Sequence, residues 1–483
     1  MRRRDFIRAA TGVGAAAGLA ACGSSSSSSP AASTSAGGGG AGTSAGASAG
    51  TSAGTSGGGG AVTGTVNVSF QQFGSSHIQS NFLSGVVKQF EAANPKAKVS
   101  LQPILASEND YYTKLELAMR SPRTSPDVVY EDTFLINSDI SAGYLTALDD
   151  RLASWADWKQ FKPTAKTAAQ ALDGKTYGIP DGTDVRAIWY NKKIFAQAGL
   201  PTTWQPKSWA DILTAAKTIK AKVPGVIPLN VYSGTGVGEA ASMQGFEMLL
   251  YGTPNGTLFD KASQKWVVGS KGFTDALGFI QEVFSTNLGP TAQLALGPTW
   301  GNTVQQEYLP KSKLAIDIDG SWLSGTWLPT GAAPWPAWHE TMGNAYMPTQ
   351  TGQGAGKVTM SGGWTWAIPK NAQNPDAAWA LIKMLTSKAG ELAYDINGVQ
   401  IPVRTDVSAD PSFVKANPTN AFFSNLVTNT IYRPAYSDYS KISLVIQQAT
   451  EKVMTNSASP AQATQFYTQG VTQIVTGAKV TNA

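Results

Sequence analysis

The stretch GTVNVSFQQFGSSHIQSNFLSGVVKQFEAANPKAKVSLQPI, residues 64–104, determines the fold class that the sequence predicts. Apolar and polar residues alternate over residues 64–70, which is typical of a β-strand. Over residues 82–90 the apolar positions recur at helical spacing. This pattern stops at Asn94-Pro95, because the residue before a proline disfavours the helical conformation. KVSLQPI, residues 98–104, predicts a second strand.

The same order of elements continues along the chain. Residues 110–120 predict a helix, and PDVVYE, residues 126–131, predicts a third strand. Strands that alternate with helices in this way predict a parallel sheet with right-handed crossovers. Ligands of such sheets lie beyond the carboxyl ends of the strands. We therefore expect one crevice that is bordered by Gln71–Ser76, Ala106–Asp110 and Glu131–Phe134.

A second α/β unit begins near Val185. Its strand and helix patterns are AIWYN (187–191), SWADILTAAKTIK (208–220), VIPLNVY (226–232) and KLAIDIDGSW (313–322). Two later amphipathic helices are predicted, one that starts at Pro375 and one over residues 441–454. The sequence therefore predicts two α/β lobes with a cleft between them.

The first 61 residues differ in composition from the rest of the chain. Arg2–Arg8 is positively charged, and residues 9–21 are too short and too weakly apolar to span a bilayer. Arg3-Arg4 resembles a twin-arginine export signal, and Leu19-Ala20-Ala21-Cys22 resembles a bacterial lipobox. We expect residues 1–21 to be a signal peptide, Cys22 to carry a lipid, and residues 22–61, rich in Gly, Ser, Ala and Thr, to be a flexible tether.

Composition argues against several classes of function. The net charge of +5 is small for 483 residues, and no cluster of Lys and Arg follows the first eight residues, so we expect no nucleic-acid partner. Cys22 is the single cysteine, and the two histidines, His77 and His339, lie far apart in the chain. We therefore expect no thiol chemistry, no metal site and no cofactor.

Several motifs resemble those of the family 1 extracellular solute-binding proteins of ABC importers, the class that contains the maltose-binding protein. They occur in the family's order and spacing, and together they cover nearly all of residues 62–483. The motifs are FLSGVVKQFEAANPKAKV (82–99), DGKTYGIP (173–180) followed by WYNKKIFAQAGLPTTW (189–204), IDGSWL (318–323), SGGWTWAIPKNAQNPDAAWALIKMLTS (361–387) and GVQIPVR (398–404).

The resemblance implies an α/β, two-lobed fold of the periplasmic-binding-protein type, with a hinge and a ligand cleft between the lobes. Lobe 1 would comprise residues 62–181 plus 345–398, and lobe 2 residues 182–344 plus 399–483. The implied crossings lie near residues 179–185, 345–348 and 399–402. The resemblance also implies a monomeric receptor without catalytic residues, anchored by Cys22 to the outer face of the cell membrane. It would deliver a carbohydrate to the permease subunits of an ABC importer.

The resemblance also implies ligand-binding residues. Trp322 matches a tryptophan that stacks on sugar, and Asp184 matches an acidic ligand contact. Glu131 and Asp132 end the third strand, at the crevice. The remaining candidates are Gly362, Gly363 and Trp364 of one loop, Tyr232, Tyr436, Tyr439, Trp300, and Arg404, which could instead form hydrogen bonds between the lobes. Phe73 stands where the family often has a tryptophan, so a stacking contact there is in doubt.

Alternatives remain open for these residues and for the function. The candidate rings could be core residues, the carboxylates could be helix caps or ion-pair partners, and the glycines could form a tight turn. A secreted glycosidase would need two carboxylates about 5–10 Å apart, which no motif singles out. An adhesive surface protein would show repeats. A receptor for a polyamine, a phosphate ester or a metal chelate also fits the fold, although the few arginines argue against a phosphate ester.

Overall fold

The computed structural model describes residues 62–171 and 173–482. The predicted signal peptide, Cys22 and the tether lie outside the described residues. In the part of the chain that is described, no helix combines the length and the apolar run that a membrane crossing requires.

The first sheet has five strands in the order β2-β1-β3-β14-β4. Strands β1 (Gly64–Gln72), β2 (Ala97–Leu105) and β3 (Val128–Asp132) are parallel, which confirms the predicted β-α-β-α-β order. β14 (Gly363–Ala367), which the sequence did not predict, lies antiparallel to both β3 and β4 (Gly178–Thr183). The main helices of this layer are α1 (Ile78–Ala93), α2 (Glu108–Met119), α13 (Pro375–Leu385) and α14 (Lys388–Gly398).

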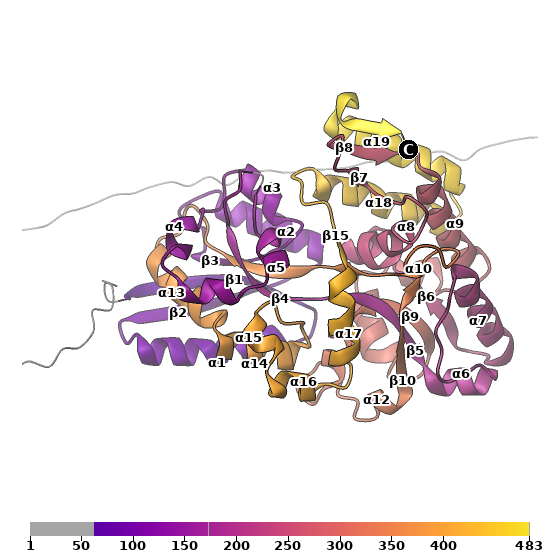
Figure 1. Cartoon of the computed structure of the whole chain (residues 1–483), viewed down its shortest axis with the longest axis horizontal. Helices are drawn as coiled ribbons and strands as arrows, with labels where there is room; N and C mark the ends of the chain where they lie inside the picture. The colour runs from indigo at the N-terminus through magenta and orange to yellow at the C-terminus, as the bar shows by residue number, and fades with distance from the viewer. Residues whose placement is uncertain (1–61, 172, 483) are drawn as a thin grey trace, which may run out of the picture. The chain divides into compact units, whose positions relative to one another are not determined.

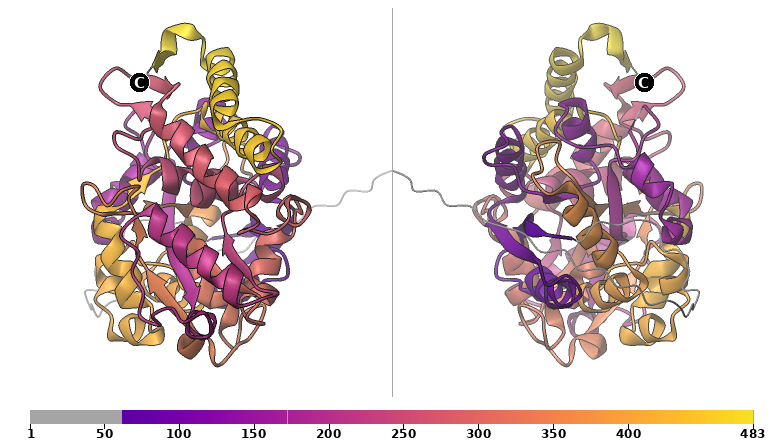
Figure 2. Two further views of the ribbon diagram at one scale, coloured as in Figure 1. Left: turned by 90° about the vertical axis from the view of Figure 1, so that its right-hand side faces the viewer. Right: turned by 90° about the vertical axis from the view of Figure 1, so that its left-hand side faces the viewer.

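The second sheet has four strands in the order β10-β5-β9-β6 (Figure 1). β5 (Arg186–Asn191) lies antiparallel to β9 (Leu314–Gly320) and to β10 (Met342–Ala345), whereas β6 (Ile227–Asn230) is parallel to β9. Its main helices are α6 (Lys192–Ala198), α7 (Trp209–Lys222), α9 (Lys271–Ser285), α18 (Tyr439–Met454) and α19 (Pro460–Val475). The two C-terminal helices α18 and α19 pack on α9 (Figure 2).

Shorter elements connect these layers. The short helices are α3 (Ile136–Ser141), α4 (Asp149–Leu152), α5 (Pro163–Ala168), α8 (Met248–Leu250), α10 (Ala292–Ala295), α11 (Trp300–Thr303), α12 (Trp338–Thr341), α15 (Thr405–Ser408), α16 (Pro411–Ala416) and α17 (Asn420–Leu426). π-Helices span Ala241–Glu247 and Val304–Tyr308. β7 (Phe259–Asp260), β8 (Lys265–Val268) and β16 (Val480–Asn482) form a small third sheet.

The apolar periodicity read from the sequence corresponds to buried faces. Val66, Val68 and Phe70 of β1 are at most 1% exposed and pack with α1 and α13 in one core. A larger core extends from α2 and β3 to α9, α18 and α19, and it joins the two layers. Burial of these apolar side chains, at about 25 cal/mol per Å², is the main stabilising contribution.

Within the described residues the chain passes between the two layers three times, once between α14 and α18, at residues 399–438, and twice beside the strands of the sheets. One is Thr183–Arg186, between β4 and β5. The other lies between β10 and β14, where β11 (Met347–Pro348) and β12 (Lys357–Val358) form a hairpin and β13 (Met360–Ser361) pairs with β15 (Ile431–Tyr432). The lobe limits given above stay a prediction. Arg404, which was assigned to lobe 2, forms an isolated antiparallel β-bridge with Phe161, which was assigned to lobe 1.

Candidate functional site

Five charged residues meet between the two sheets. We call Asp132, Asp184, Arg186, Glu239 and Arg433 the charged cluster. Each is at most 7% exposed. Asp132 ends β3, Asp184 lies between β4 and β5, and Arg186 begins β5, so the ends of three strands position them. We call the region around this cluster, at the ends of the strands, the crevice; Asp132 belongs to the Glu131–Phe134 border expected from the sequence, and ligand binding here stays a prediction.

Two groups of ion pairs form the cluster. Arg186 pairs with Asp184, and the Gly362 N–H donates to Asp184 Oδ1 at 2.7 Å. Arg433 pairs with Asp132 at 2.6 Å and with Glu239 at 3.2 Å. Both groups lie against Gly362. These contacts satisfy charges that would otherwise be costly to bury.

Burial and charge act in opposite directions on these groups. Burial raises the pKa of Asp132 to about 6, against the opposing influence of Arg433 and of the Phe134 N–H, which donates to Asp132 Oδ1 at 3.1 Å. Burial alone would lower the pKa of Arg433, but the charges of Asp132 and Glu239 raise it well above its usual range. At neutral pH we therefore take both members of this pair as charged.

Aromatic rings lie on the first sheet's side of the crevice. Trp364, at the start of β14, is partly exposed and stacks on Tyr130 with centroids 4.7 Å apart and planes 9° apart. Phe73, which is 40% exposed, meets the Trp364 ring edge-on at 5.5 Å. Two adjacent rings with exposed area offer a surface for the apolar face of a ligand.

Trp322 lies on the second sheet's side. It follows β9 and is partly exposed, and the Arg186 guanidinium carbon lies 4.7 Å from its ring centroid. Its ring rests on Gly320, where a Cβ would come within 1.9 Å of it. The expected stacking residue is therefore present beside the charged cluster, with one face occupied by an arginine.

Four of the candidates lie outside the cluster: Tyr232, Trp300 and Arg404 are buried, and Tyr436 is partly exposed. The Tyr232 hydroxyl donates to Asp319 at 3.1 Å and the Trp300 N–H donates to Asn230 at 3.0 Å, and both rings are 2% exposed. Tyr436 packs on Phe259 with centroids 4.1 Å apart. Arg404 is 1% exposed and contacts Asp157, Asp406 and the Thr386 carbonyl.

The other candidates divide between the cluster and its surroundings. Asp132 and Asp184 belong to it, the Gly362 N–H donates to Asp184, and the Tyr439 hydroxyl lies 2.8 Å from Glu239 Oε1. Gly363, at the start of β14, accepts from the Thr133 N–H at 3.1 Å. Glu131, although next to Asp132, is fully buried, and burial first and then Asp139 raise its pKa.

Sequence reasoning missed three members of the cluster: Arg186, Glu239 and Arg433. Arg186 stands in the apolar run of β5 and Arg433 follows β15, so each is a charge inside an otherwise apolar segment. That signal was available, since buried charges are usually paired. The pairing of Arg433 with Asp132 was not predictable, because the two residues are 301 positions apart in the chain.

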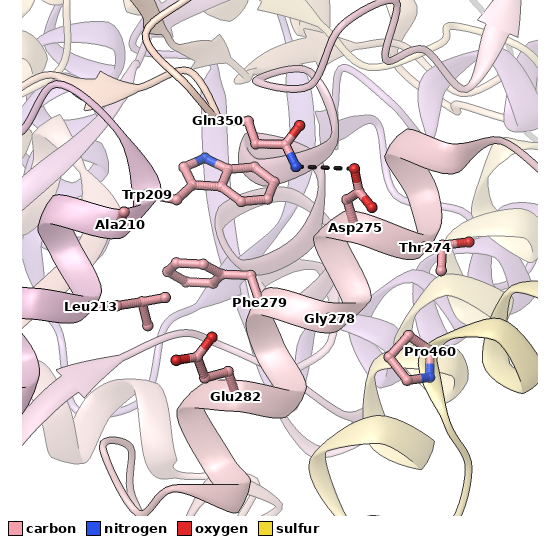
Figure 3. A pocket seen from close by; sticks show the side chains of 10 residues that line it. All are labelled: Trp209, Ala210, Leu213, Thr274, Asp275, Gly278, Phe279, Glu282, Gln350 and Pro460. Carbon is pink, nitrogen blue, oxygen red and sulfur yellow. Dashed lines mark hydrogen bonds between the residues drawn. The ribbon is translucent and has the colours of Figure 1, made fainter.

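Two further features, possible metal ligands and a groove outside the charged cluster, do not add to the candidate site. The described residues contain no group of three or more His, Cys, Asp and Glu side chains that could hold a metal ion. A groove of about 420 Å³ lies between α7 and α9, with Trp209 and Phe279 on its walls (Figure 3). The Gln350 amide donates to Asp275 at 3.0 Å beside it, and its lining contains no member of the charged cluster.

The arrangement of two sheets and their helices is the fold of the two-lobed solute-binding proteins. The family model described as "Bacterial extracellular solute-binding protein" matches residues 74–392, and the chain belongs to this family. The lobe built on the first sheet is called the first lobe below, and the lobe built on the second sheet is called the second lobe. The family and its structural neighbours are binding proteins, which fits a receptor better than an enzyme.

Similar proteins share the fold at low identity. A solute-binding protein of Thermotoga lettingae, solved with α-D-tagatose, aligns with a TM-score of 0.74 at 23% identity, over 85% of this chain and 99% of the other. The GacH receptor of Streptomyces glaucescens aligns with a TM-score of 0.72 at 22% identity, over 86% and 99%. The galactooligosaccharide-binding protein of Bacillus subtilis is 21% identical over 80% of this chain and 84% of its own length.

Proposed function

We propose that this protein is the carbohydrate receptor of an ABC importer. The observation that carries the proposal is the combination of the partly exposed rings Phe73, Trp364 and Trp322 with buried carboxylates and arginines in one crevice. Sugars present apolar faces, which suit aromatic rings, and a rim of hydroxyls, which suits fixed acceptors and donors. Family membership and relatives named for lactose and galactooligosaccharides support the same function.

The remaining expectations belong to this proposal. The protein acts outside the cytoplasm as a monomer, held at the outer face of the membrane by a lipid on Cys22. It delivers the sugar to the permease subunits. Lobe 1, residues 62–181 plus 345–398, closes on lobe 2, residues 182–344 plus 399–483. Closure traps the ligand between Trp364 and Trp322.

A saccharide panel tests the proposal. A ligand at about 100 times its dissociation constant stabilises the native state by roughly 2.7 kcal/mol, which thermal shift detects. Calorimetry then measures affinity for Trp364→Ala and Trp322→Ala. Each change should weaken binding about 30- to 1000-fold, a loss of roughly 2–4 kcal/mol.

Trp158→Ala is the matched control, because Trp158 is also partly exposed but packs on Trp155 and Phe161 instead of the charged cluster. It should leave affinity unchanged. Absence of binding to any mono- or oligosaccharide would refute the carbohydrate assignment. Conversion of a saccharide to product would identify an enzyme.

A further inference from the structure

The segment around Arg433 lies between the two lobes. β15 pairs with β13 in parallel, with Met360 opposite Ile431 and Ser361 opposite Tyr432. Figure 1 shows β15 in the middle of the described unit, between the first and second sheets. Arg433 follows directly after β15, so its position is set by a strand pair at the junction and not by either sheet.

Arg433 contacts one carboxylate from each side. Asp132, 2.6 Å away, ends β3 of the first sheet. Glu239, 3.2 Å away, lies between β6 of the second sheet and the π-helix Ala241–Glu247. The guanidinium also lies 4.4 Å from the ring centroid of Phe134. Phe134 in turn meets the ring of Tyr439 on α18 edge-on at 5.7 Å.

Glu239 is held in place by groups of the second lobe alone. The Ser443 hydroxyl donates to its Oε2 at 2.5 Å, and the Tyr439 hydroxyl, which is shared with Glu247, lies 2.8 Å from its Oε1. Both hydroxyls belong to α18, which also forms part of the core of this lobe. The carboxylate is therefore oriented for Arg433 by the protein itself.

A second contact joins the lobes at the edge of the crevice. The Ser75 hydroxyl, in the loop after β1, donates to Gln306 in the π-helix Val304–Tyr308 at 3.2 Å. Gly74 has a φ of +55°, and a Cβ there would lie 2.5 Å from the Asn302 amide nitrogen. The contacts that join the lobes here are formed by protein atoms.

We propose that Arg433 is a closure residue, whose ion pairs to Asp132 and Glu239 draw the two lobes together independently of the sugar. The inference rests on the proposed function, because closure matters for a receptor that traps its ligand. A receptor that already samples the closed form binds more tightly, since apparent affinity scales with the fraction of the binding-competent form. Removing Arg433 should therefore lower the ratio of closed to open molecules by about tenfold, which corresponds to about 1.4 kcal/mol in the free energy of closure.

The test measures the distance between the lobes without sugar. In a Cys22→Ser background, which removes the single native cysteine, spin labels are attached at Lys88→Cys on α1 and Thr214→Cys on α7, both exposed. Pulsed electron resonance then gives the populations of short and long distances. We expect the short distance to be populated in the parent. In Arg433→Met the ratio of the short-distance to the long-distance population should be about tenfold lower.

Arg404→Met is the matched control. Arg404 is also buried and pairs with two carboxylates, Asp157 and Asp406. It lies against Phe161 and the Thr386 carbonyl beside the core of the first sheet, and it does not contact Asp132 or Glu239. It should lower thermal stability and leave the distance distribution unchanged. Asp132→Asn, which keeps the side-chain shape, serves as a second variant if Arg433→Met does not fold, and it should also lower the short-distance population.

The outcomes are separable from those of the sugar panel. An unchanged distribution in Arg433→Met, or in Asp132→Asn where the former does not fold, would overturn the closure role. So would a parent that shows the long distance alone. These measurements contain no sugar, so failure of the panel would refute the carbohydrate assignment without altering this result.

Discussion

Two neighbouring glycines of the crevice should respond differently to the same added methyl group. Gly363 has a φ of +137°, and its Cβ would lie 2.8 Å from the Gly182 carbonyl oxygen, which is backbone. Gly362 has no positive φ, and its Cβ would lie 3.2 Å from Arg433 Nη2, 3.3 Å from Asp184 Oδ1 and 3.4 Å from Arg186 Nη1. Gly363→Ala therefore strains the backbone, whereas Gly362→Ala displaces charged side chains.

The expected magnitudes follow from these contacts. A residue forced into this backbone region costs about 1–3 kcal/mol. At about 1–2 °C per kcal/mol for a chain of this size, Gly363→Ala should melt about 1–6 °C lower. In Gly362→Ala the neighbouring charged side chains need to shift by a few tenths of an ångström. The free energy of unfolding should change by less than about 1 kcal/mol. Because it moves both halves of the charged cluster, we expect about tenfold weaker saccharide binding, or about 1.4 kcal/mol.

The assay is thermal unfolding of each ligand-free variant, followed by calorimetry with the tightest saccharide of the panel. Gly278→Ala is the control, because Gly278 lies within α9 and its Cβ would have no heavy atom within 4 Å. It should be neutral or stabilising by up to about 1 kcal/mol. The reasoning fails if Gly362→Ala melts lower than Gly363→Ala and binds as tightly as the parent.

Two further predictions use other measurements. Cys22→Ala should release the protein from washed membranes without changing its thermal unfolding, because the lipid is proposed to be its anchor; retention in the membrane fraction would contradict this. Acidification from pH 8 to about 5.5 should raise the melting temperature. Burial raises the pKa of Asp132 to about 6, of Asp139 to about 7 and of Glu247 to about 8, so the folded form binds more protons than the unfolded form in this window. A lower melting temperature at pH 5.5 would contradict that sign.

The elements that the sequence predicted are those with a strong local pattern. β1, α1, β2, α2 and β3 follow from period-2 and helical apolar spacing, and Pro375 marks the first turn of α13 as expected. β14 was not predicted, because GWTWA is only five residues long and its pairing with β3 and β4 is antiparallel and distant in sequence. Pattern alone does not encode such a partner.

The candidate site was predictable in part, for the same reason. Of the candidates, Asp132 and Asp184 lie in the charged cluster and Gly362 lies next to it, and their contact with a ligand stays a prediction. The resemblance could not separate a partly exposed ring such as Trp364 from a buried one such as Trp300, because both are tryptophans in mixed surroundings. Exposure depends on tertiary packing, which one sequence does not reveal.

The cost of the charged cluster is itself an argument for its role. Replacing buried ion pairs by apolar side chains of similar volume is often neutral or stabilising, so stability alone does not explain five charges in the crevice. The raised pKa of Asp132 has burial as its largest cause, which means that folding keeps this carboxylate where its charge is disfavoured. Such groups concentrate at functional sites. Here they lie between the partly exposed rings of the two lobes, where a ligand and a closing movement would both use them.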